Sequence, residues 1–350
     1  MMEQIHTLQS NSLGTAVRLA LPSDGELHAP TMNFMELCGL SVKRANPRRY
    51  TGSVPSVPGV VTLFQRATDI PAKVDEGSAD IGIVGLDRYM EFKRDQGETS
   101  ILMQDLDFGK CELVLAVPDL WIDITSMNDL SNLSTEFKNA GKELRIATKF
   151  PRLTEKFLSS NNIHHFTIVL SSGGLEAAPT MGYADLIADL SASGSTLREN
   201  GLKTLDDGGI LASQACLIGN LRLLGLEPSK LFPVKQILEK IEGYLRAQEY
   251  STVTANVPGN SPADVASQML SQPHLLGIQG PTIAPVFSHS LEEWFSVTIL
   301  VKSSQIPEVV ESFRNLNGNG IAVSRHQYLF QRESSSYQSL IDNIKDWKIA

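Results

Sequence analysis

Short apolar segments alternate with segments of helical character along the first part of this 350-residue chain. Residues 17–21, 60–64 and 81–85 are apolar runs of strand length, and residues 32–38 and 70–77 between them have the pattern of short helices. Because parallel strands are joined by crossover helices, this alternation predicts an α/β fold with mostly parallel sheets.

A second region of the same kind is expected from Cys111 onward. Its predicted elements are strands at 112–117, 144–147, 167–170 and 184–190, with helices at 153–159 and 174–179. A further strand at 212–220 and an amphipathic helix at 233–247 follow. No internal sequence repeat is evident.

Beyond Tyr250 the pattern changes. Strands are expected at 251–257, 295–301 and 320–323, and helices at 262–271 and 307–316. A strand–helix–strand–strand–helix–strand order of this size is typical of a ferredoxin-like module. The Ser-rich stretch from Glu333 is not assigned.

The composition limits the possible partners. The net charge of −9 and the pI of about 5.3 disfavour a nucleic-acid partner, so an anionic ligand would be held by local groups or a metal ion. Cys38, Cys111 and Cys216 are far apart, which argues against disulfides and zinc. The start of the chain resembles no signal peptide and no run of about 18 apolar residues occurs. We therefore expect a cytoplasmic protein with a short, loose N-terminal tail and no membrane partner.

The segment DLSASGSTLRENGL, residues 189–202, is the most informative one. Small residues let a backbone approach a ligand closely, and hydroxyl groups supply hydrogen bonds to an anion. Asp185 and Asp189 precede this loop, where a carboxylate can hold a sugar hydroxyl or magnesium. A Ser-rich turn that caps a helix is the alternative interpretation. No Gly-Lys-Ser or Gly-Lys-Thr follows, so the segment is not a Walker loop.

Residues 185–202 resemble the phosphoribosyl-binding loop of ATP phosphoribosyltransferase, the first enzyme of histidine biosynthesis. Four further segments resemble the same family in the same order: DIPAKVDEGSADIGIVGLDRYME (69–91), DLDFGKCELVLAVP (105–118), RIATKFPRLT (145–154) and GGLEAAPTMGYADLIADL (173–190). GPTIAPV (280–286) resembles the long form of the family, whose added ferredoxin-like domain binds histidine as a feedback inhibitor.

The resemblance implies an architecture. The fold would be α/β, with a two-lobed catalytic part like that of periplasmic binding proteins and a ferredoxin-like C-terminal domain. Lobe I would comprise residues 1–110 and 206–248, lobe II residues 111–205, and the regulatory domain residues 249–350. A homo-oligomer, a dimer or a hexamer, is expected.

The resemblance also implies an activity: ATP and phosphoribosyl pyrophosphate are condensed to N1-(5-phosphoribosyl)-ATP and pyrophosphate. Mg²⁺ is the expected cofactor, on the pyrophosphate. The implied catalytic residues are Glu176, Asp185 and Asp189. Phosphoribosyl pyrophosphate would be bound by Ser191, Ser193, Gly194, Ser195, Thr196 and Leu197, ATP or pyrophosphate by Arg66, Asp87, Lys149 and Arg49, and inhibitory histidine by Thr282 and Ala284.

The opening loop departs from the family pattern. The family usually has Pro-Lys-Gly-Arg-Leu after its first strand, whereas residues 22–27 here are PSDGEL, with Asp24 and Glu26 in place of the basic pair. Carboxylates there would repel substrate phosphates. Either Lys43, Arg48 or Arg49 replaces the lost charge, or the chain is an impaired paralogue that senses histidine or regulates an active subunit. A solute-binding module without chemistry is the third alternative.

Overall fold

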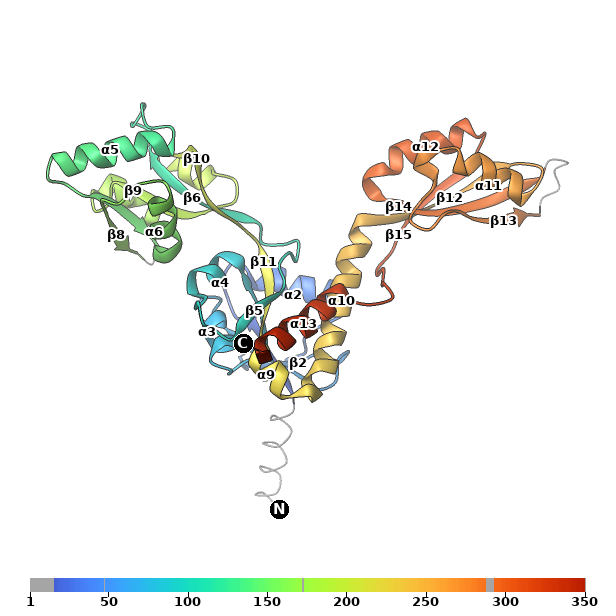
Figure 1. Ribbon diagram of the computed structural model, residues 1–350, viewed down its shortest axis with the longest axis horizontal. Coiled ribbons are helices and arrows are strands. Elements are labelled where there is room, and N and C mark those ends of the chain that lie inside the picture. The colour runs from blue at the N-terminus through green and yellow to red at the C-terminus, as the bar shows by residue number, and fades with distance from the viewer. Residues whose placement is uncertain (1–15, 47, 172, 288–292, 350) are drawn as a thin grey trace, which may run out of the picture. The chain divides into compact units, whose positions relative to one another are not determined.

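The computed structural model describes residues 16–46, 48–171, 173–287 and 293–349, so the expected N-terminal tail lies outside the described residues. The chain divides into two compact units (Figure 1). The first contains the chain up to Val234 together with its end from Ser339, and the second contains Lys235–Gln338. No described helix is long and apolar enough to cross a membrane.

The first sheet of the larger unit has the strand order β2-β3-β1-β4-β11-β5. Strands β1, β3 and β4 are parallel, while β2, β5 and β11 pair antiparallel with their neighbours. The strands are β1 (Val17–Pro22), β2 (Thr51–Ser53), β3 (Val60–Gln65), β4 (Ile81–Gly85), β5 (Thr99–Met103) and β11 (Ala215–Asn220). The helices of this lobe are α2 (His28–Leu37), α3 (Ile70–Asp75), α4 (Leu86–Phe92) and α9 (Leu221–Leu226).

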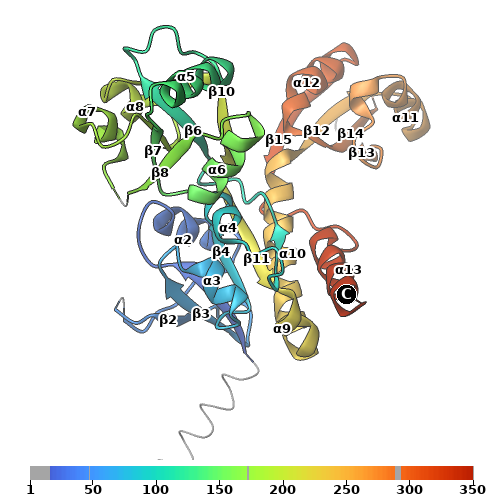
Figure 2. The same ribbon diagram turned by 60° about the vertical axis from the view of Figure 1, so that its left-hand side comes forward.

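The second sheet has the order β10-β6-β9-β7-β8, with β7, β8 and β9 parallel. Its strands are β6 (Cys111–Pro118), β7 (Leu144–Thr148), β8 (Phe166–Leu170), β9 (Leu186–Ser191) and β10 (Leu202–Ser213). Its helices are α5 (Met127–Asn139), α6 (Pro151–Ser160), α7 (Ala178–Met181) and α8 (Ser195–Glu199), with a 3₁₀ turn at Leu175–Ala177. Figure 2 shows the two sheets with their helices.

Two features of the second lobe differ from the expectation. Helix α5 was not predicted, although Ser126 and Asp129 form a capping box at its start. Strand β10 pairs with β6 as far as Ser213, so the expected boundary at residue 205 falls inside a strand. We propose that lobe II extends to Ser213, where the chain passes to β11 of the first sheet.

The two lobes repeat one arrangement that the sequence does not reveal. In each, a central strand is flanked by two parallel strands: β3-β1-β4 in lobe I and β8-β7-β9 in lobe II. Arg18 of β1 donates from its backbone and its guanidinium to Asp80, just before β4. Arg145 of β7 makes the same contacts with Asp185, just before β9. Each pair therefore ties two strands together at the amino end of its sheet.

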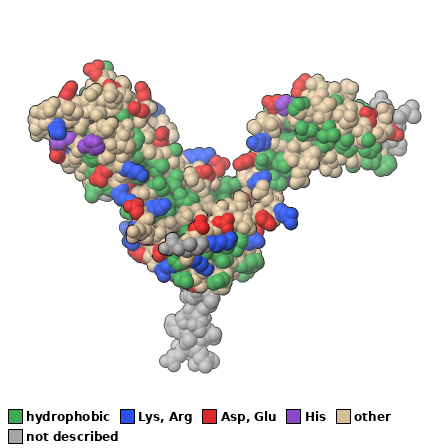
Figure 3. All heavy atoms as spheres, in the orientation of Figure 1, with side chains coloured by type: hydrophobic (Ala, Val, Ile, Leu, Met, Phe, Trp, Pro, Cys, Tyr) green, Lys and Arg blue, Asp and Glu red, His purple; other side chains and the backbone are tan. Residues whose placement is uncertain are grey.

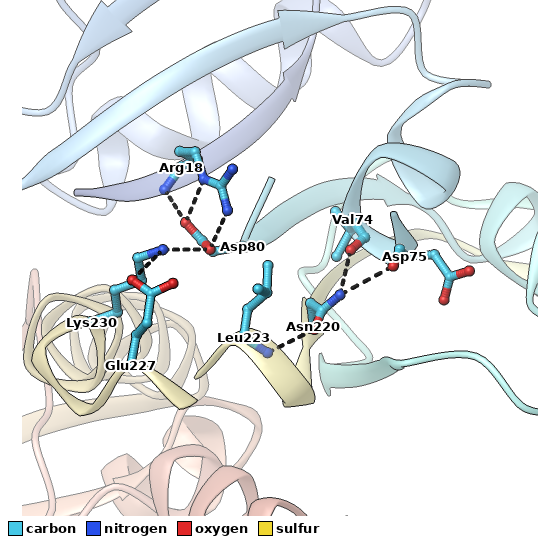
Figure 4. Close-up of polar contacts among 8 residues, drawn as sticks. All are labelled: Arg18, Val74, Asp75, Asp80, Asn220, Leu223, Glu227 and Lys230. Atoms are coloured by element: carbon cyan, nitrogen blue, oxygen red, sulfur yellow. Dashed lines mark hydrogen bonds and ion pairs between the residues drawn. The ribbon is translucent and has the colours of Figure 1, made fainter. Parts of the chain in front are cut away.

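The pair in lobe I is part of a larger buried network (Figure 4). Asp80 is fully buried and also accepts a hydrogen bond from Lys230 Nζ at 3.0 Å. Lys230, 1% exposed, pairs with Glu227 at 3.0 Å as well. Burial opposes ionisation of Asp80, but the hydrogen bonds from Arg18 and Lys230 outweigh it and lower its pKa. The network thus fixes the segment after α9 to the first sheet.

The second unit has the expected ferredoxin-like topology. Its sheet has the order β13-β14-β12-β15 with every pair antiparallel, and its apolar face packs against α11 and α12. The elements are β12 (Tyr250–Pro258), α11 (Pro262–Leu270), β13 (Thr282–Val286), β14 (Trp294–Lys302), α12 (Ile306–Asn315) and β15 (Asn319–Arg325). The expected fold class is confirmed, but the expectation of mostly parallel sheets is wrong. Among the described strand pairs, β1–β3, β1–β4, β7–β8 and β7–β9 are parallel, and the other pairs are antiparallel.

Two helices carry the chain from one unit to the other. Helix α10 (Leu231–Glu249) begins in the first unit and continues into the second, and α13 (Ser335–Ile349) runs in the opposite sense. In the first unit α13 packs on α9, where the side chain of Ile344 closely approaches Gly225. The regulatory domain was expected to run from residue 249 to residue 350, but the end of α13 belongs to the first unit. We therefore propose that this domain ends near Gln338.

Candidate active site

The carboxyl ends of the parallel strands in both lobes carry the polar residues expected to bind a ligand. The turn with Asp24 follows β1, Arg66 follows β3, and Asp87 follows β4. In lobe II, Lys149 follows β7 and the Ser-rich loop follows β9. Ligands of open α/β sheets bind outside the carboxyl ends of the strands, so this is the edge at which a site is expected.

A cavity of about 660 Å³ opens at this edge. Its polar lining includes Asp24, Glu26, Arg66, Thr68, Asp87, Arg88, Lys110 and Cys111, and Leu190 and Ala192 line it from lobe II. Residues of both lobes thus share one cavity. Three carboxylates and three basic groups line it, so a polyanionic ligand would meet charges of both signs.

Asp87 lines this cavity, and Ser213 holds its carboxylate in place. Its carboxylate accepts a hydrogen bond from Ser213 Oγ at 2.7 Å, and its N–H donates to the same oxygen at 2.9 Å. Ser213 ends β10, so the contact joins α4 to the strand that crosses between the lobes.

Burial, with the charges of Asp87 and Glu26, raises the pKa of Cys111 to about 11, which leaves the thiol neutral at pH 7.

The Ser-rich loop is organised by its own side chains. Ser191 Oγ accepts a hydrogen bond from the Gly194 N–H, and Ser193 Oγ lies 2.9 Å from Ser195 Oγ. Gly194 has φ of +71°, a conformation that favours glycine. Ser193, Ser195 and Thr196 are exposed, so their hydroxyl groups are open to a ligand.

Asp189 stands at the carboxyl end of β9, beside this loop. One carboxylate oxygen accepts a hydrogen bond from the Leu190 N–H at 2.9 Å. Burial raises its pKa, and the charge of Glu176 acts in the same direction; the Leu190 N–H and the charges of Lys149 and Arg88 oppose the rise. Glu176, Lys149 and Arg88 are therefore all within electrostatic range of Asp189. A perturbed carboxylate beside a cleft is a typical functional residue.

Asp185 has a different role from the one expected. It lies before the first residue of β9, at the opposite end of the strand from the loop, and both its oxygens accept hydrogen bonds from Arg145. The assignment of Asp185 to ribose binding is therefore corrected to a structural pairing. The sequence analysis had grouped Asp185 with Asp189 because both precede the loop, although the length of a strand separates them.

Of the other residues expected to bind substrate, some lie at the cavity and others do not. Arg66 and Asp87 line the cavity, and Lys149 lies beside Asp189. Leu197 is 4% exposed and packs in the core of lobe II, so only its backbone can reach a ligand. Arg49 is exposed in the loop before β2 and does not line the cavity.

The expected histidine site falls on the second unit. Thr282 lines a cavity of about 810 Å³ together with Arg246, Thr252, Thr298, Arg332 and Glu333. Ala284 is exposed two residues further along β13 and is not part of that lining. The cavity offers both signs of charge and several hydroxyl groups.

Three basic residues near the site were not singled out from the sequence. Arg88 and Lys110 line the cavity, and Arg198 donates to the carbonyl of Ser193 at 3.2 Å. Arg88 follows Asp87 directly and Lys110 precedes Cys111, so both lie inside segments with recognised motifs. Their positive charge could have marked them as candidate phosphate-binding residues, but only the fold shows that Arg88 and Lys110 line the cavity.

The lobes also meet away from the cavity. Glu91 of α4 accepts hydrogen bonds from the N–H groups of Arg152 and Leu153, at the start of α6. The Arg152 side chain donates to the carbonyls of Glu91 and Lys93. Burial raises the pKa of Glu91 against these N–H groups. A carboxylate of one lobe thus satisfies N–H groups that α6 leaves without partners within the helix.

The described residues contain no group of three or more His, Cys, Asp or Glu side chains that could hold a metal ion. Asp87 and Asp189 are single carboxylates at the cavity and beside it. Magnesium is usually bound by one or two protein carboxylates and by the phosphates of a substrate, and this arrangement fits such binding.

In the space-filling view, acidic and basic side chains are interspersed over the visible face (Figure 3). That face presents no continuous basic area among the described residues. A sequence-independent nucleic-acid binder is expected to carry such an area.

Comparisons with known proteins agree on one family. Residues 66–243 match the family model described as ATP phosphoribosyltransferase, and residues 247–326 match the model of the C-terminal domain of the same proteins. ATP phosphoribosyltransferase 2, chloroplastic, from Arabidopsis thaliana is 38% identical over 94% of this chain and 80% of its own length. The ATP phosphoribosyltransferase of Rhodopseudomonas palustris strain BisB18 is 31% identical over 92% of this chain and 96% of its own length.

One solved structure resembles the larger unit. It is the ATP phosphoribosyl transferase (HisG:HisZ) complex from Thermotoga maritima, with a TM-score of 0.50 and 27% sequence identity. The match covers 64% of this chain and 95% of that one. The two-lobed fold is thus similar to that of the known structure, and the separately matched C-terminal domain lies in the second unit.

Proposed function

This chain belongs to the ATP phosphoribosyltransferase family, and on that premise we propose that its cavity between the two lobes performs the reaction of the family with the residues described above. The enzyme is a pentosyltransferase that condenses ATP with phosphoribosyl pyrophosphate, the first step of histidine biosynthesis. The observation that carries the assignment of the site is the shared cavity, at the carboxyl ends of the strands and beside Asp189 and the Ser-rich loop.

In this reaction the N1 atom of adenine forms a bond to C1 of the ribose, and the bond from C1 to the pyrophosphate oxygen breaks. The electron pair of that bond leaves with pyrophosphate. The protein must hold two anions close together and in line, so positioning and charge stabilisation are its main contributions.

Lobe II would hold the phosphoribosyl group. The hydroxyl groups of Ser193, Ser195 and Thr196 are exposed and would bind the 5′-phosphate with the N–H groups of the loop. Asp189 would hold the ribose hydroxyls, and Glu176 lies near enough to affect its pKa. The ionised Asp189 carboxylate would also stabilise positive charge that develops on the ribose as the C1–O bond breaks.

Lobe I would bind the ATP. Arg66 lines the cavity and offers a bidentate fork to phosphate oxygens, while Lys149 adds a point charge from lobe II. The acidic opening loop also lines the cavity, through Asp24 and Glu26. Arg49, considered from the sequence as a replacement for the missing basic pair, is not in the lining, so any replacement charge would have to come from Arg66, Arg88 or Lys110, which are.

The family uses a divalent metal ion. We propose Mg²⁺, which would be bound mainly by the pyrophosphate of the substrate, with Asp87 or Asp189 supplying a protein carboxylate. When bound, it would neutralise charge on the leaving group. The lack of a preformed three-residue cluster among the described residues agrees with a metal that arrives with its substrate.

The second unit would bind histidine. Its cavity of about 810 Å³ brings Arg246 and Arg332, Glu333 and three threonines together, a set that suits the carboxylate, the ammonium group and the ring of an amino acid. Thr282 stays in this proposal and Ala284 is dropped from it.

We keep the homo-oligomer and the cytoplasmic location as further proposals, which gel filtration and cell fractionation would test.

Pyrophosphate release by the full-length protein with ATP, phosphoribosyl pyrophosphate and magnesium tests the function. Release should require both substrates and fall when histidine is added. The acidic loop favours a second candidate, an impaired member that binds histidine without turnover. Histidine binding by calorimetry together with no pyrophosphate release would select that candidate.

A further inference from the structure

Arg88 belongs to α4 of lobe I, but its contacts reach lobe II. Its guanidinium carbon lies 4.2 Å from the centre of the Phe150 ring, just before α6. Its Nε lies 3.7 Å from the Asp87 carboxylate, and its side chain is 19% exposed. The residue also lines the cavity. A shielded guanidinium is thus held between the lobes and faces the space where substrates would meet.

The position of Arg88 is fixed by the helix contact described above. Glu91, three residues further along α4, accepts the two N–H groups at the start of α6. Residues three apart lie on the same side of a helix, so Glu91 and Arg88 approach lobe II together. The contact therefore holds Arg88 against Phe150 and within range of Asp189.

The cavity holds carboxylates as well as cations, so the strength of each cation matters for phosphate binding. Asp24 and Glu26 bring negative charge to the side where lobe I should meet phosphate groups. Lys110 lines the cavity too, and like Arg88 it pairs with an aspartate, but its side chain is 67% exposed whereas that of Arg88 is 19% exposed. Water screens an exposed cation more than a shielded one, so Arg88 should attract a phosphate more strongly than Lys110.

We propose that Arg88 binds the diphosphate group of phosphoribosyl pyrophosphate, from the lobe opposite to the one that holds the 5′-phosphate. The inference rests on the proposed function, because the loop and Asp189 would occupy the 5′-phosphate and the ribose. The diphosphate on C1 is then the part of the substrate that faces lobe I. A guanidinium that stacks through its face keeps its N–H edges available for phosphate oxygens.

Binding of inorganic pyrophosphate with magnesium, measured by calorimetry on the full-length protein, tests this site without turnover. Arg88→Met should weaken binding about 10- to 100-fold, the loss expected for a charged hydrogen-bonding partner. Arg94→Ala is the matched control, since Arg94 is 69% exposed and pairs with Asp75 outside the cavity. Equal affinity for the wild type and Arg88→Met would overturn the proposal.

Kinetics separate this role from a structural one. Arg88→Met should raise KM for phosphoribosyl pyrophosphate far more than KM for ATP, and Arg88→Lys should recover part of the loss. An equal rise in both constants with a lowered Tm would mean that Arg88 only holds the lobes together. If the wild type binds pyrophosphate through Arg88 but does not turn over, the anion site stands and only the proposed function fails.

Discussion

Lobe I and lobe II share one end of their architecture and differ at the other. At the amino ends of the strands, Arg18 with Asp80 and Arg145 with Asp185 make the same contacts in the same register. At the carboxyl ends, lobe II carries a Ser-rich loop and lobe I a turn with two carboxylates. The repeated end ties neighbouring strands together, and the divergent end carries the residues proposed to form the site.

The difference explains why two aspartates of one segment have unlike roles. Asp185 precedes β9 and Asp189 lies in its last half, so the first contacts its arginine partner and the second is near the carboxyl end of the strand. The comparison predicts that changes at the amino ends alter stability and changes at the carboxyl ends alter catalysis.

The largest expected effect is on turnover. Asp189→Asn should lower kcat/KM by at least about 100-fold, because the carboxylate that holds ribose and stabilises its charge is lost. Asp185→Asn should keep most of the activity at temperatures where it is folded. Steady-state pyrophosphate release by the two variants measures the difference. A similar loss of activity in both would contradict the claim that only the carboxyl ends of the strands serve catalysis.

The sequence predicted most of the first sheet and the topology of the second unit, because their strands are apolar runs bounded by Gly, Pro or Asp. It did not predict α5, whose Ser126–Asp129 capping box is short and polar. It also missed β10, of which only Ala212 and Ser213 fall in a predicted strand and whose segment KTLDDGG contains acidic and glycine residues. Those residues are tolerated because β10 pairs with β6 along an irregular register.

For the site, local motifs predicted the loop, Asp189 and Asp87, which the fold brings to the cavity or beside it; their roles in binding stay a proposal. The role of Asp185 was misassigned because it lies beside a functional motif while its side chain points to a structural partner. The side chain of Leu197 is buried, so only a backbone contact remains possible for that residue. Arg88 was missed because its contact with Phe150 joins residues far apart in the chain.

The next largest effect concerns stability. Asp80→Asn should destabilise the protein by about 3–5 kcal/mol, because the buried Lys230 would lose its buried carboxylate and keep only Glu227, which is 38% exposed. Asp185→Asn should cost about 1 kcal/mol or less, since Arg145 is 41% exposed to water. Urea unfolding of both variants measures the difference, and equal costs would contradict the role given to burial.

The same pair has a defined pH dependence. The folded-state pKa of Asp80 is below its ordinary value of 3.8, so its contribution to stability is present above that value and is lost as pH falls through the folded pKa. The gap in unfolding free energy between wild type and Asp80→Asn should shrink below about pH 4. A gap that stays constant to pH 2 would show that Asp80 does not act through its charge.

A smaller effect is expected from the backbone of the loop. Gly194→Ala should raise KM for phosphoribosyl pyrophosphate roughly tenfold, since alanine at φ of +71° costs about 1–2 kcal/mol and shifts the loop. Gly182→Ala is the control, with φ of +76° and no neighbour within 4 Å of the added carbon. It should lower Tm without changing KM. A rise of KM in the control would mean that the effect of Gly194→Ala on KM is not specific to the Ser-rich loop.

The smallest effect is a shift in the pH profile. Lys149 lowers the pKa of Asp189, so Lys149→Met should move the acidic limb of kcat/KM to higher pH while also weakening activity. The pH dependence of the two enzymes at subsaturating substrate measures the shift. An unmoved limb would mean that this limb reports a group other than Asp189.

A crystal structure with phosphoribosyl pyrophosphate and magnesium bound tests the central claim most directly, namely that the site lies at the carboxyl ends of both sheets. The account predicts the 5′-phosphate on Ser193, Ser195 and Thr196, the ribose at Asp189, and the diphosphate toward Arg88. A substrate bound at the amino ends, beside Arg145 and Asp185, or held by lobe II without contact to lobe I, would contradict it.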